Sequence, residues 1–278
     1  MLTVHHLEYS QSFRIVWLLE ELKVVEYELK LYKRNQDNSA PKELQDLSPL
    51  GTAPVITDEL SDGTSIVLCE SNAIIDYILD KAEEQASQAQ YENSAAASTI
   101  QRKTNFATSD DVKKQNNHVD YLFWYHSCQG TLQPLIQVDS LFRIMQTKVP
   151  FPLSTIVKLL YKKLQINYLL PRLSKYLTLL ETQLGKNNQT SSVVGGNNDH
   201  GDSSITAADI TLIYPMDVIF SRYNKDHDFA SKYPNCMKWL ESMRSRPAFQ
   251  RAQEKVHENT TTRSSTNNTS GGRISKDL

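Results

Sequence analysis

The sequence predicts an α+β protein in which a small mixed domain precedes an all-helical one. Over residues 1–81, short segments that alternate apolar and polar residues are interleaved with segments whose apolar residues recur at helical spacing. From residue 110 to 256, almost every apolar residue falls at helical spacing. The order of these patterns predicts a β-α-β-α-β-β-α domain over 1–81 and a helical domain over 110–256.

The elements of the first domain follow one another at short intervals. Strands are predicted at 2–6 and 27–32, and a hairpin at 55–58 and 66–68 turns on Asp62-Gly63. Amphipathic helices are predicted at 12–22 and 70–81, with a weaker helix at 41–47. A βαβ unit followed by a hairpin and a helix is the order of a thioredoxin-like fold.

The helical domain contains two long apolar patterns. The pattern over 120–145 is interrupted by Pro134, and the pattern over 154–185 is expected to kink at Pro171 and to stop at Gly185. Thr206 to Asp209 resembles a capping box and predicts the start of another helix. One or two further helices are expected around Trp239 to Pro247.

Three polar segments dilute the hydrophobic composition. They are a low-complexity insert at 82–109, a polar loop at 187–204 and a tail at 257–278, all of which we predict to be disordered or loosely ordered. Such segments bury too little apolar surface to offset the ~1–2 kcal/mol per residue cost of ordering the backbone. They account for a mean hydropathy of −0.48 in a chain that otherwise has an ordinary core.

Composition excludes several classes of protein. Lys plus Arg is 30 and Asp plus Glu is 32, so the net charge of −2 argues against a nucleic-acid partner. The cysteines, Cys69, Cys128 and Cys236, form no CxxC motif, which argues against a disulfide scaffold or a zinc site, and no metal is expected. The first residues lack a signal-peptide pattern and no apolar run approaches ~20 residues, so a cytoplasmic location is expected.

Three loops of the first domain carry candidate binding residues. Ser10 lies between the first strand and helix, where a hydroxyl either caps the helix or stabilises an anion; capping is the favoured interpretation. Pro54 enters a strand after Ala53 and is a candidate cis-proline. Glu70 and Ser71 open a helix, where they act as a cap or bind the ammonium and carboxylate of an amino-acid head group.

An aromatic cluster occupies the start of the helical domain. It consists of Tyr121, Trp124, Tyr125 and His126. On a helix, an aromatic stripe of this kind is more often core than pocket, and a histidine in it is either buried and hydrogen-bonded or a polar group near a reacting atom. We keep the cluster as a candidate pocket for an apolar substrate.

The motifs in their order resemble one family. The segments are Ser12-Phe13-Arg14-Ile15-Val16-Trp17-Leu18-Leu19-Glu20-Glu21-Leu22, Ser48-Pro49-Leu50-Gly51-Thr52-Ala53-Pro54, Leu68-Cys69-Glu70-Ser71-Asn72-Ala73-Ile74-Ile75, Tyr121-Leu122-Phe123-Trp124-Tyr125-His126, Gly130-Thr131-Leu132-Gln133-Pro134, Val149-Pro150-Phe151-Pro152-Leu153 and Thr206-Ala207-Ala208-Asp209-Ile210. Together they resemble a cytosolic-type glutathione transferase, and within that family the fungal branch that includes the endoplasmic-reticulum-associated yeast enzymes.

The resemblance implies a role for each candidate residue. Ser10 aligns with the catalytic serine of the serine-type classes, and the Ala53 backbone before Pro54 would pair with the cysteinyl part of glutathione. Glu70 and Ser71 would hold the γ-glutamyl end. Thr52 stands where close relatives often carry a lysine for the glycine carboxylate, and the alternatives for supplying that charge are Arg34 and Lys42.

The resemblance also implies an activity and partners. Glutathione would be the co-substrate, without a metal, and its thiolate would attack hydrophobic electrophiles held between the domains beside Tyr121, Trp124, Tyr125 and His126. Glutathione peroxidase activity, a detoxification or stress role, a twofold homodimer and peripheral association with the endoplasmic reticulum membrane are further implications. The alternative is a catalytically weak binding or regulatory module. A thiol oxidoreductase would need a cysteine where Ser10 and Ser12 stand.

Overall fold

A computed structural model describes residues 1–23, 25–48, 50–89, 100–101, 112–186, 192–194 and 205–261. The described residues form two compact units. The first draws on residues 1–102, 204–214 and 243–272, and the second on 103–203, 215–242 and 273–278. Segments from the C-terminal part of the chain therefore complete the first unit, which a single boundary near residue 81 does not anticipate.

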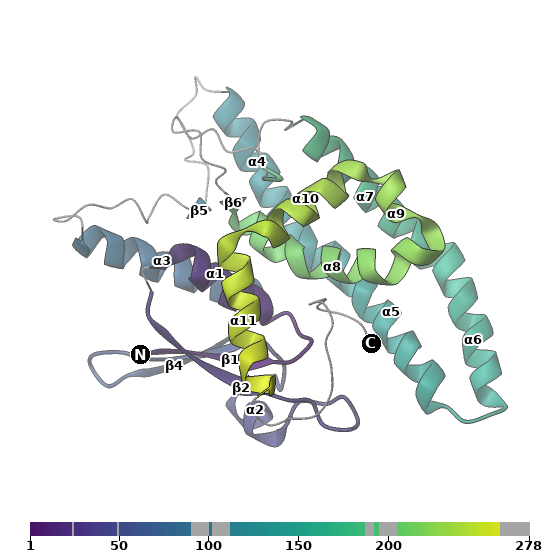
Figure 1. Ribbon diagram of the computed structural model, residues 1–278, viewed down its shortest axis with the longest axis horizontal. Coiled ribbons are helices and arrows are strands. Elements are labelled where there is room, and N and C mark those ends of the chain that lie inside the picture. The colour runs from purple at the N-terminus through teal and green to yellow at the C-terminus, as the bar shows by residue number, and fades with distance from the viewer. Residues whose placement is uncertain are drawn as a thin grey trace. The chain divides into compact units, whose positions relative to one another are not determined.

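A four-stranded sheet forms the centre of the first unit (Figure 1). Its strands are β1 (Leu2–Leu7), β2 (Tyr27–Tyr32), β3 (Val55–Glu59) and β4 (Ser65–Cys69), in the order β2-β1-β3-β4. β1 pairs parallel with β2 and antiparallel with β3, and β3 pairs antiparallel with β4. This mixed sheet confirms the predicted thioredoxin-like order.

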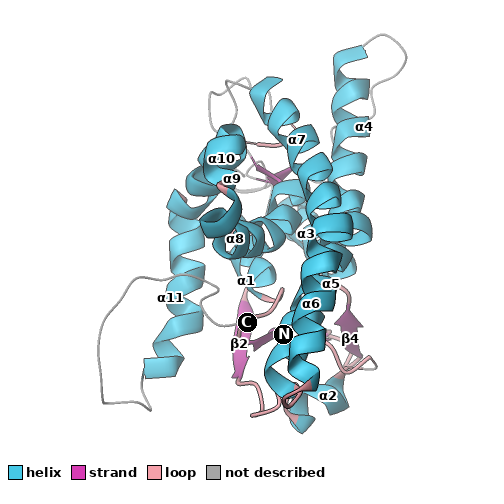
Figure 2. Cartoon of the chain, turned by 90° about the vertical axis from the view of Figure 1, so that its right-hand side faces the viewer, coloured by secondary structure: helices cyan, strands magenta, loops and turns pink. Residues whose placement is uncertain are grey.

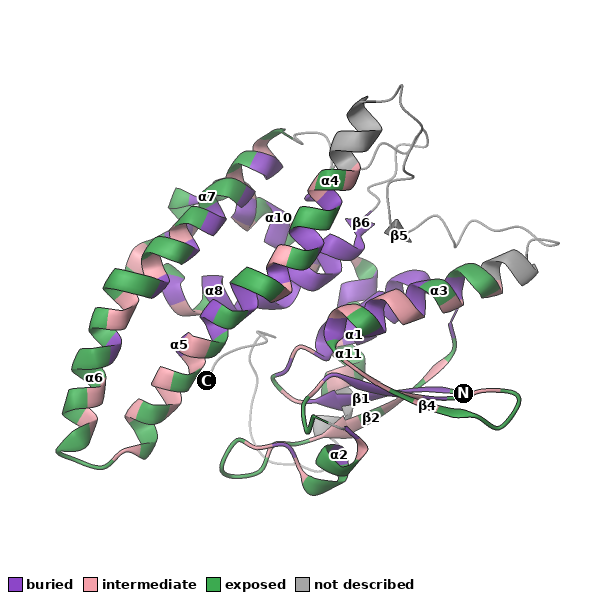
Figure 3. Ribbon diagram, turned by 180° about the vertical axis from the view of Figure 1, so that it is seen from behind, coloured by how far each residue is buried: buried purple, intermediate pink, exposed green. Residues whose placement is uncertain are grey.

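Helices cover both faces of this sheet, so β1 is buried along its whole length (Figure 3). α1 (Phe13–Leu22) and α3 (Ser71–Ala89) lie on one face, and α2 (Lys42–Leu47) lies on the other (Figure 1). On the α2 face, Leu44 joins Leu7 and Val55 in a small apolar cluster. The β1–α1 and β4–α3 connections both end at the start of a helix, and they carry the candidate serines.

α11 (Pro247–Thr261) packs on α1, which also contacts α3 and β1, and every residue of α1 is buried. The ring of Phe249 meets Trp17 edge-on with 5.4 Å between ring centroids. Beside it, Arg246 donates to both carboxylate oxygens of Glu21 at 2.6 and 3.0 Å, and Arg251 donates to Glu20 at 3.1 Å. Glu20 and Glu21 can be buried on α1 because each forms an ion pair with an arginine from the C-terminal part of the chain.

The second unit's described part contains helices and connecting loops but no strands (Figure 2). Its helices are α4 (Val112–Ser127), α5 (Gln133–Lys148), α6 (Leu153–Leu164), α7 (Leu170–Lys186), α9 (Phe229–Lys232) and α10 (Pro234–Ser245), together with the later part of α8 (Ala207–His227). The predicted all-helical architecture is confirmed.

Two π-helical turns mark the positions of the predicted interruptions. η1 (Cys128–Leu132) leads into α5 just before Pro134, and η2 (Gln165–Leu169) leads into α7 just before Pro171. A proline cannot donate to the carbonyl four residues earlier, which here belongs to a residue inside each π turn. The wider turn accommodates the missing bond, so the helix axis continues as a bulge where the sequence predicted a break.

The edges of the polar segments differ from the predictions. α3 continues to Ala89, into the predicted insert at 82–109, and α11 continues to Thr261, into the predicted tail. β5 (Ile100–Gln101) pairs parallel with β6 (Ile205–Thr206), and residues 192–194 inside the predicted loop are buried. Long-range pairing and packing order these stretches, which local composition does not reveal. The remaining residues of the three segments lie outside the described part.

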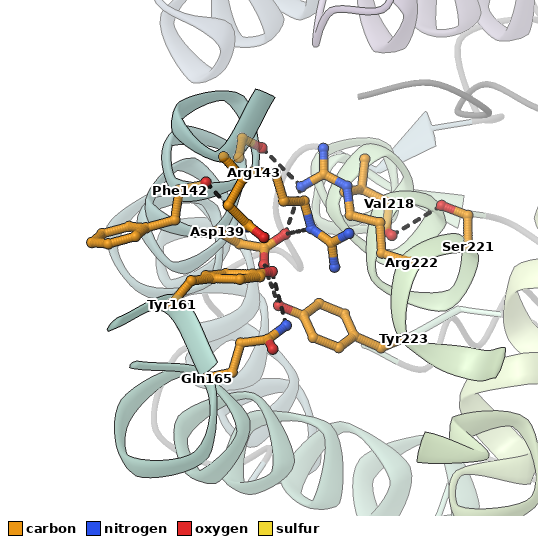
Figure 4. A network of polar contacts seen from close by, with 11 residues as sticks. Asp139, Phe142, Arg143, Tyr161, Gln165, Val218, Ser221, Arg222 and Tyr223 are labelled. Atoms are coloured by element: carbon orange, nitrogen blue, oxygen red, sulfur yellow. Dashed lines mark hydrogen bonds and ion pairs between the residues drawn. The ribbon is translucent and has the colours of Figure 1, made fainter. Parts of the chain in front are cut away.

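A buried carboxylate links three helices of the second unit (Figure 4). Tyr161 and Tyr223 donate to one oxygen of Asp139, the latter at 2.6 Å. Arg143 and Arg222 donate to the other oxygen at 2.9 and 2.8 Å. Burial, together with the hydrogen bond to this carboxylate, raises the pKa of both tyrosines. α5, α6 and α8 are thus joined through a single charge.

Replacing that charge is expected to destabilise the protein. Asp139→Asn leaves the cations of Arg143 and Arg222 without their counter-ion, and we expect about 3 kcal/mol less free energy of unfolding in urea. Asp226→Asn, which removes an exposed carboxylate from α8, is the matched control and is expected to change it by less than about 0.5 kcal/mol. Equal effects from the two variants would contradict this role for Asp139.

Candidate functional site

Both candidate serines follow a residue with a left-handed backbone. Tyr9, before Ser10, has a φ of 52°, and Glu70, before Ser71, has a φ of 74°. Such a conformation costs a non-glycine residue of order 1–3 kcal/mol and is found most often at binding and active sites. The two serines are therefore held by strained connections at the N-terminal ends of α1 and α3.

The Ser10 hydroxyl belongs to a buried cluster. Its Oγ lies 2.6 Å from the Oγ of Ser12 and accepts a hydrogen bond from the Ser12 N–H at 3.2 Å. Ser12 stands at the N-cap of α1 but makes no side-chain capping bond; its Oγ lies 2.9 Å from Nδ1 of His6. The Ser12 hydroxyl therefore does not cap α1, whereas the Ser10 hydroxyl accepts from a backbone N–H at the start of the helix, which agrees with the capping alternative for Ser10.

His6 lies on β1 and is buried beneath the serines. Burial and, to a smaller extent, the charge of His257 on α11 lower the pKa of His6 to about 4. The imidazole is therefore neutral at pH 7 and carries a single ring proton. The sequence offered no signal for this role, because a histidine within a strand gives no indication of which loop side chain it meets.

Gln11 connects the two serine sites. Its Oε1 accepts from the Arg14 guanidinium and from the Ser71 hydroxyl, the latter at 3.5 Å. Arg14 is fully buried, and it also donates to the carbonyls of Gln11 at 3.2 Å and Thr211 at 2.9 Å. Through these bonds the N-terminal ends of α1 and α3 form one site. Neither Gln11 nor Arg14 was singled out from the sequence.

The loop before β3 contains the predicted cis-proline. The Ala53–Pro54 peptide is cis, and the sheet's pairing begins two residues later, where Val55 meets His5 and Cys69. The Ala53 backbone is therefore outside the sheet's pairing.

The residues expected to bind the charged ends of glutathione differ in their exposure and in their hydrogen bonds. Glu70 is exposed, whereas Ser71 is buried. Thr52 is exposed and offers no charge. Of the two alternatives, Arg34 donates to the carbonyls of Glu8 and Asn38 at 3.1 and 2.8 Å, whereas Lys42 is exposed at the first residue of α2. The Lys42 side chain is thus the more exposed of the two cations.

The aromatic cluster of α4 lies mainly in the core. Tyr121, Trp124 and Tyr125 are each no more than 3% exposed, and His126 is exposed. The rings of Tyr121 and Tyr125 stack at 5.4 Å, and Trp124 meets Tyr176 edge-on at 5.6 Å. These contacts agree with the core alternative, and a pocket role for the cluster stays a prediction.

A pocket of about 460 Å³ opens elsewhere on the helical unit. Its walls come from η1, α5, η2 and α7, and they are mainly apolar apart from Arg172 and Lys175. The four residues of the aromatic cluster are not among its lining residues. The two π turns thus shape a hollow that the sequence did not predict.

The described residues lack two features. They contain no helix long and apolar enough to cross a bilayer. Within the same residues, no group of three or more His, Cys, Asp or Glu side chains is arranged to hold a metal ion.

A thioredoxin-like domain followed by a helical unit is the two-part architecture of the glutathione transferases. Two family models match the chain: "Glutathione S-transferase, N-terminal domain" over residues 10–81 and "Glutathione S-transferase, C-terminal domain" over residues 153–255. The chain belongs to the glutathione S-transferase family and is a glutathione transferase.

Similar proteins span almost the whole chain. Glutathione S-transferase 3 of Schizosaccharomyces pombe is 30% identical over 94% of this chain and 90% of its own. Glutathione S-transferase 1 of Saccharomyces cerevisiae is 27% identical over 92% and 95%. A solved glutathione transferase of Phanerochaete chrysosporium, in complex with oxidized glutathione, is 17% identical over 92% of this chain and 96% of its own, with a TM-score of 0.61. The fungal resemblance predicted from the motifs is confirmed.

Proposed function

We propose that this glutathione transferase joins the thiolate of glutathione to hydrophobic electrophiles, with Ser10 as the group that stabilises the thiolate. The observation that carries the proposal is the position of the Ser10 hydroxyl at the N-terminal end of α1, next in sequence to Gln11, which accepts a hydrogen bond from Ser71 at the start of α3. Reduction of peroxides by the same thiolate is a second reaction of this site.

The same site offers groups for each part of the tripeptide. The exposed carboxylate of Glu70 would receive the γ-glutamyl ammonium, and Ser71 with the N-terminus of α3 would receive its carboxylate. The Ala53 backbone, before cis-Pro54, would pair with the cysteinyl residue. The complex of the Phanerochaete chrysosporium transferase with oxidized glutathione supports glutathione as the ligand.

The physical task of the site is to lower the pKa of a thiol. A free thiol has a pKa near ~8.5, so little of it is ionised at neutral pH. A hydrogen bond from Ser10 and the dipole of α1 each favour the thiolate by ~1 kcal/mol, which together lowers the thiol pKa by about 1.5 units. About half of the thiol is then ionised at pH 7, compared with a few per cent of a free thiol. Holding the electrophile close to the thiolate further raises the rate.

Removing the hydroxyl tests this role directly. We expect Ser10→Ala to lower kcat/KM for glutathione and a chloroaromatic electrophile by about fivefold at pH 6.5, because one ~1 kcal/mol stabilisation of the thiolate is lost. Ser61→Ala, in the exposed β3–β4 turn, is the control and is expected to match the wild type. A Ser10→Ala enzyme with wild-type kcat/KM would rule out Ser10 as the thiolate donor.

The competing function is a catalytically weak binding or regulatory module. The observation that favours it is the engagement of the Ser10 hydroxyl with Ser12, together with the absence of a charge at Thr52. Retention of the wild-type protein on glutathione resin without turnover of any electrophile or peroxide would identify such a module.

Lys42 is expected to take the place of the missing lysine. Lys42→Ala removes the exposed cation that we assign to the glycine carboxylate, and the KM for glutathione is expected to rise about fivefold with little change in kcat. Lys238→Ala removes an exposed lysine from α10 and serves as the charge-matched control. An unchanged KM in Lys42→Ala would show that the carboxylate is held without this residue.

We also propose a homodimer in the cytoplasm, with peripheral association with the endoplasmic reticulum membrane as the alternative location. α5 and α6 expose a set of large apolar side chains that water disfavours: Leu141, Ile156, Leu159 and Leu160. Ile156→Asp combined with Leu160→Asp is expected to convert a dimer into a monomer in analytical ultracentrifugation. Flotation of the wild-type protein with phospholipid vesicles would favour the membrane alternative.

A further inference from the structure

The hydrogen bonds of the serine cluster can run in only a few directions. A hydroxyl donates one proton and accepts up to two hydrogen bonds. The Ser12 Oγ accepts from the Leu7 N–H at 3.2 Å, and it faces both Nδ1 of His6 at 2.9 Å and the Oγ of Ser10 at 2.6 Å. One proton must lie between each of these pairs, because two lone pairs at these distances repel one another.

The tautomer of His6 decides which way the chain of protons runs. If Nδ1 carries no proton, it accepts from Ser12, Ser12 then accepts from Ser10, and the Ser10 proton points inward. If Nδ1 carries the proton, it donates to Ser12. Ser12 then donates to the Ser10 Oγ at 2.6 Å, which is much closer than its other acceptor, the Leu7 carbonyl at 3.4 Å. Ser10 already accepts from the Ser12 N–H at 3.2 Å, so its own proton is then left for an acceptor outside the cluster.

We infer that His6, protonated at Nδ1, and Ser12 form a relay that turns the Ser10 proton outward toward the glutathione thiolate. The inference rests on the proposed function of Ser10, and it makes His6 and Ser12 positioning residues that act only through Ser10. In this direction each hydroxyl is polarised by the donor behind it, which strengthens the final bond to the sulfur.

The surroundings of His6 suit a relay with a fixed direction. His6, Ser10 and Ser12 are all at most 6% exposed, so water does not compete for their hydrogen bonds. The strand residue paired with His6 is the apolar Leu31, and the titratable group acting on it from α11 is His257. Because the pKa of His6 is lowered to about 4, the imidazole stays neutral over the pH range in which the thiol ionises.

The tautomer itself is the most direct test. In the glutathione complex of wild-type protein carrying ¹⁵N-labelled histidine, we expect the NMR spectrum to show His6 protonated at Nδ1 and unprotonated at Nε2. His6→Leu identifies the resonances by their loss. His6 protonated at Nε2 would overturn the relay, because Nδ1 would then accept from Ser12.

A kinetic cycle tests the coupling to Ser10. Ser12→Ala is expected to raise the apparent pKa in the pH profile of kcat/KM by about half a unit. Well below that pKa, kcat/KM should fall roughly threefold. On the alkaline plateau, where glutathione is already ionised, kcat/KM should not change. In the Ser10→Ala background the same substitution is expected to shift nothing further. His5→Leu is the control, because the adjacent His5 bonds to Tyr32 and Thr57 instead of the serines.

The possible outcomes separate the relay from the proposed function. A loss of equal size at every pH, or a pKa shift that persists without Ser10, would make Ser12 merely structural and overturn the relay while leaving the role of Ser10 intact. An unshifted pH profile in Ser10→Ala would overturn the role of Ser10 and the relay together. If Ser12→Ala fails to fold, as judged by circular dichroism, the tautomer in the wild-type complex still decides.

Discussion

The geometry of the site depends on one buried cation. Arg14, in the first turn of α1, has no access to water, so its guanidinium must find acceptors inside the protein. It finds them on Gln11 and on the carbonyl of Thr211. These bonds fix the turn that carries Ser10 and Ser12, and through Gln11 they tie that turn to Ser71. The candidate binding groups at the starts of two helices are therefore held in place by the protein itself.

Much of the first unit was predictable because its signals are local. The alternation of apolar and polar residues in β2 and the helical spacing of apolar residues in α1 are both patterns among near neighbours in the sequence. Both elements appear where predicted. Pro54 and Ser71 were identified by their place in a motif, and the structure gives each the expected position: a cis peptide and the first residue of a helix. Local patterns thus located the loops on which a ligand site is built.

The rest could not be predicted because it depends on contacts between distant residues. The packing of Phe249 on α1 and the pairing of β5 with β6 join segments separated by a hundred residues or more. Ser12 shows the same limit at short range. Its hydroxyl lies 2.9 Å from Nδ1 of the buried His6, a contact that the residues around Ser12 do not reveal. Composition likewise could not show that α3 continues as far as Ala89.

The central claim is that this site lowers the pKa of the glutathione thiol. Ultraviolet titration of the thiolate of glutathione bound to the wild-type protein measures that pKa without a second substrate. The account predicts a midpoint near pH 7, about 1.5 units below the value of ~8.5 for a free thiol. A bound thiol that titrates at the same pH as free glutathione would contradict it.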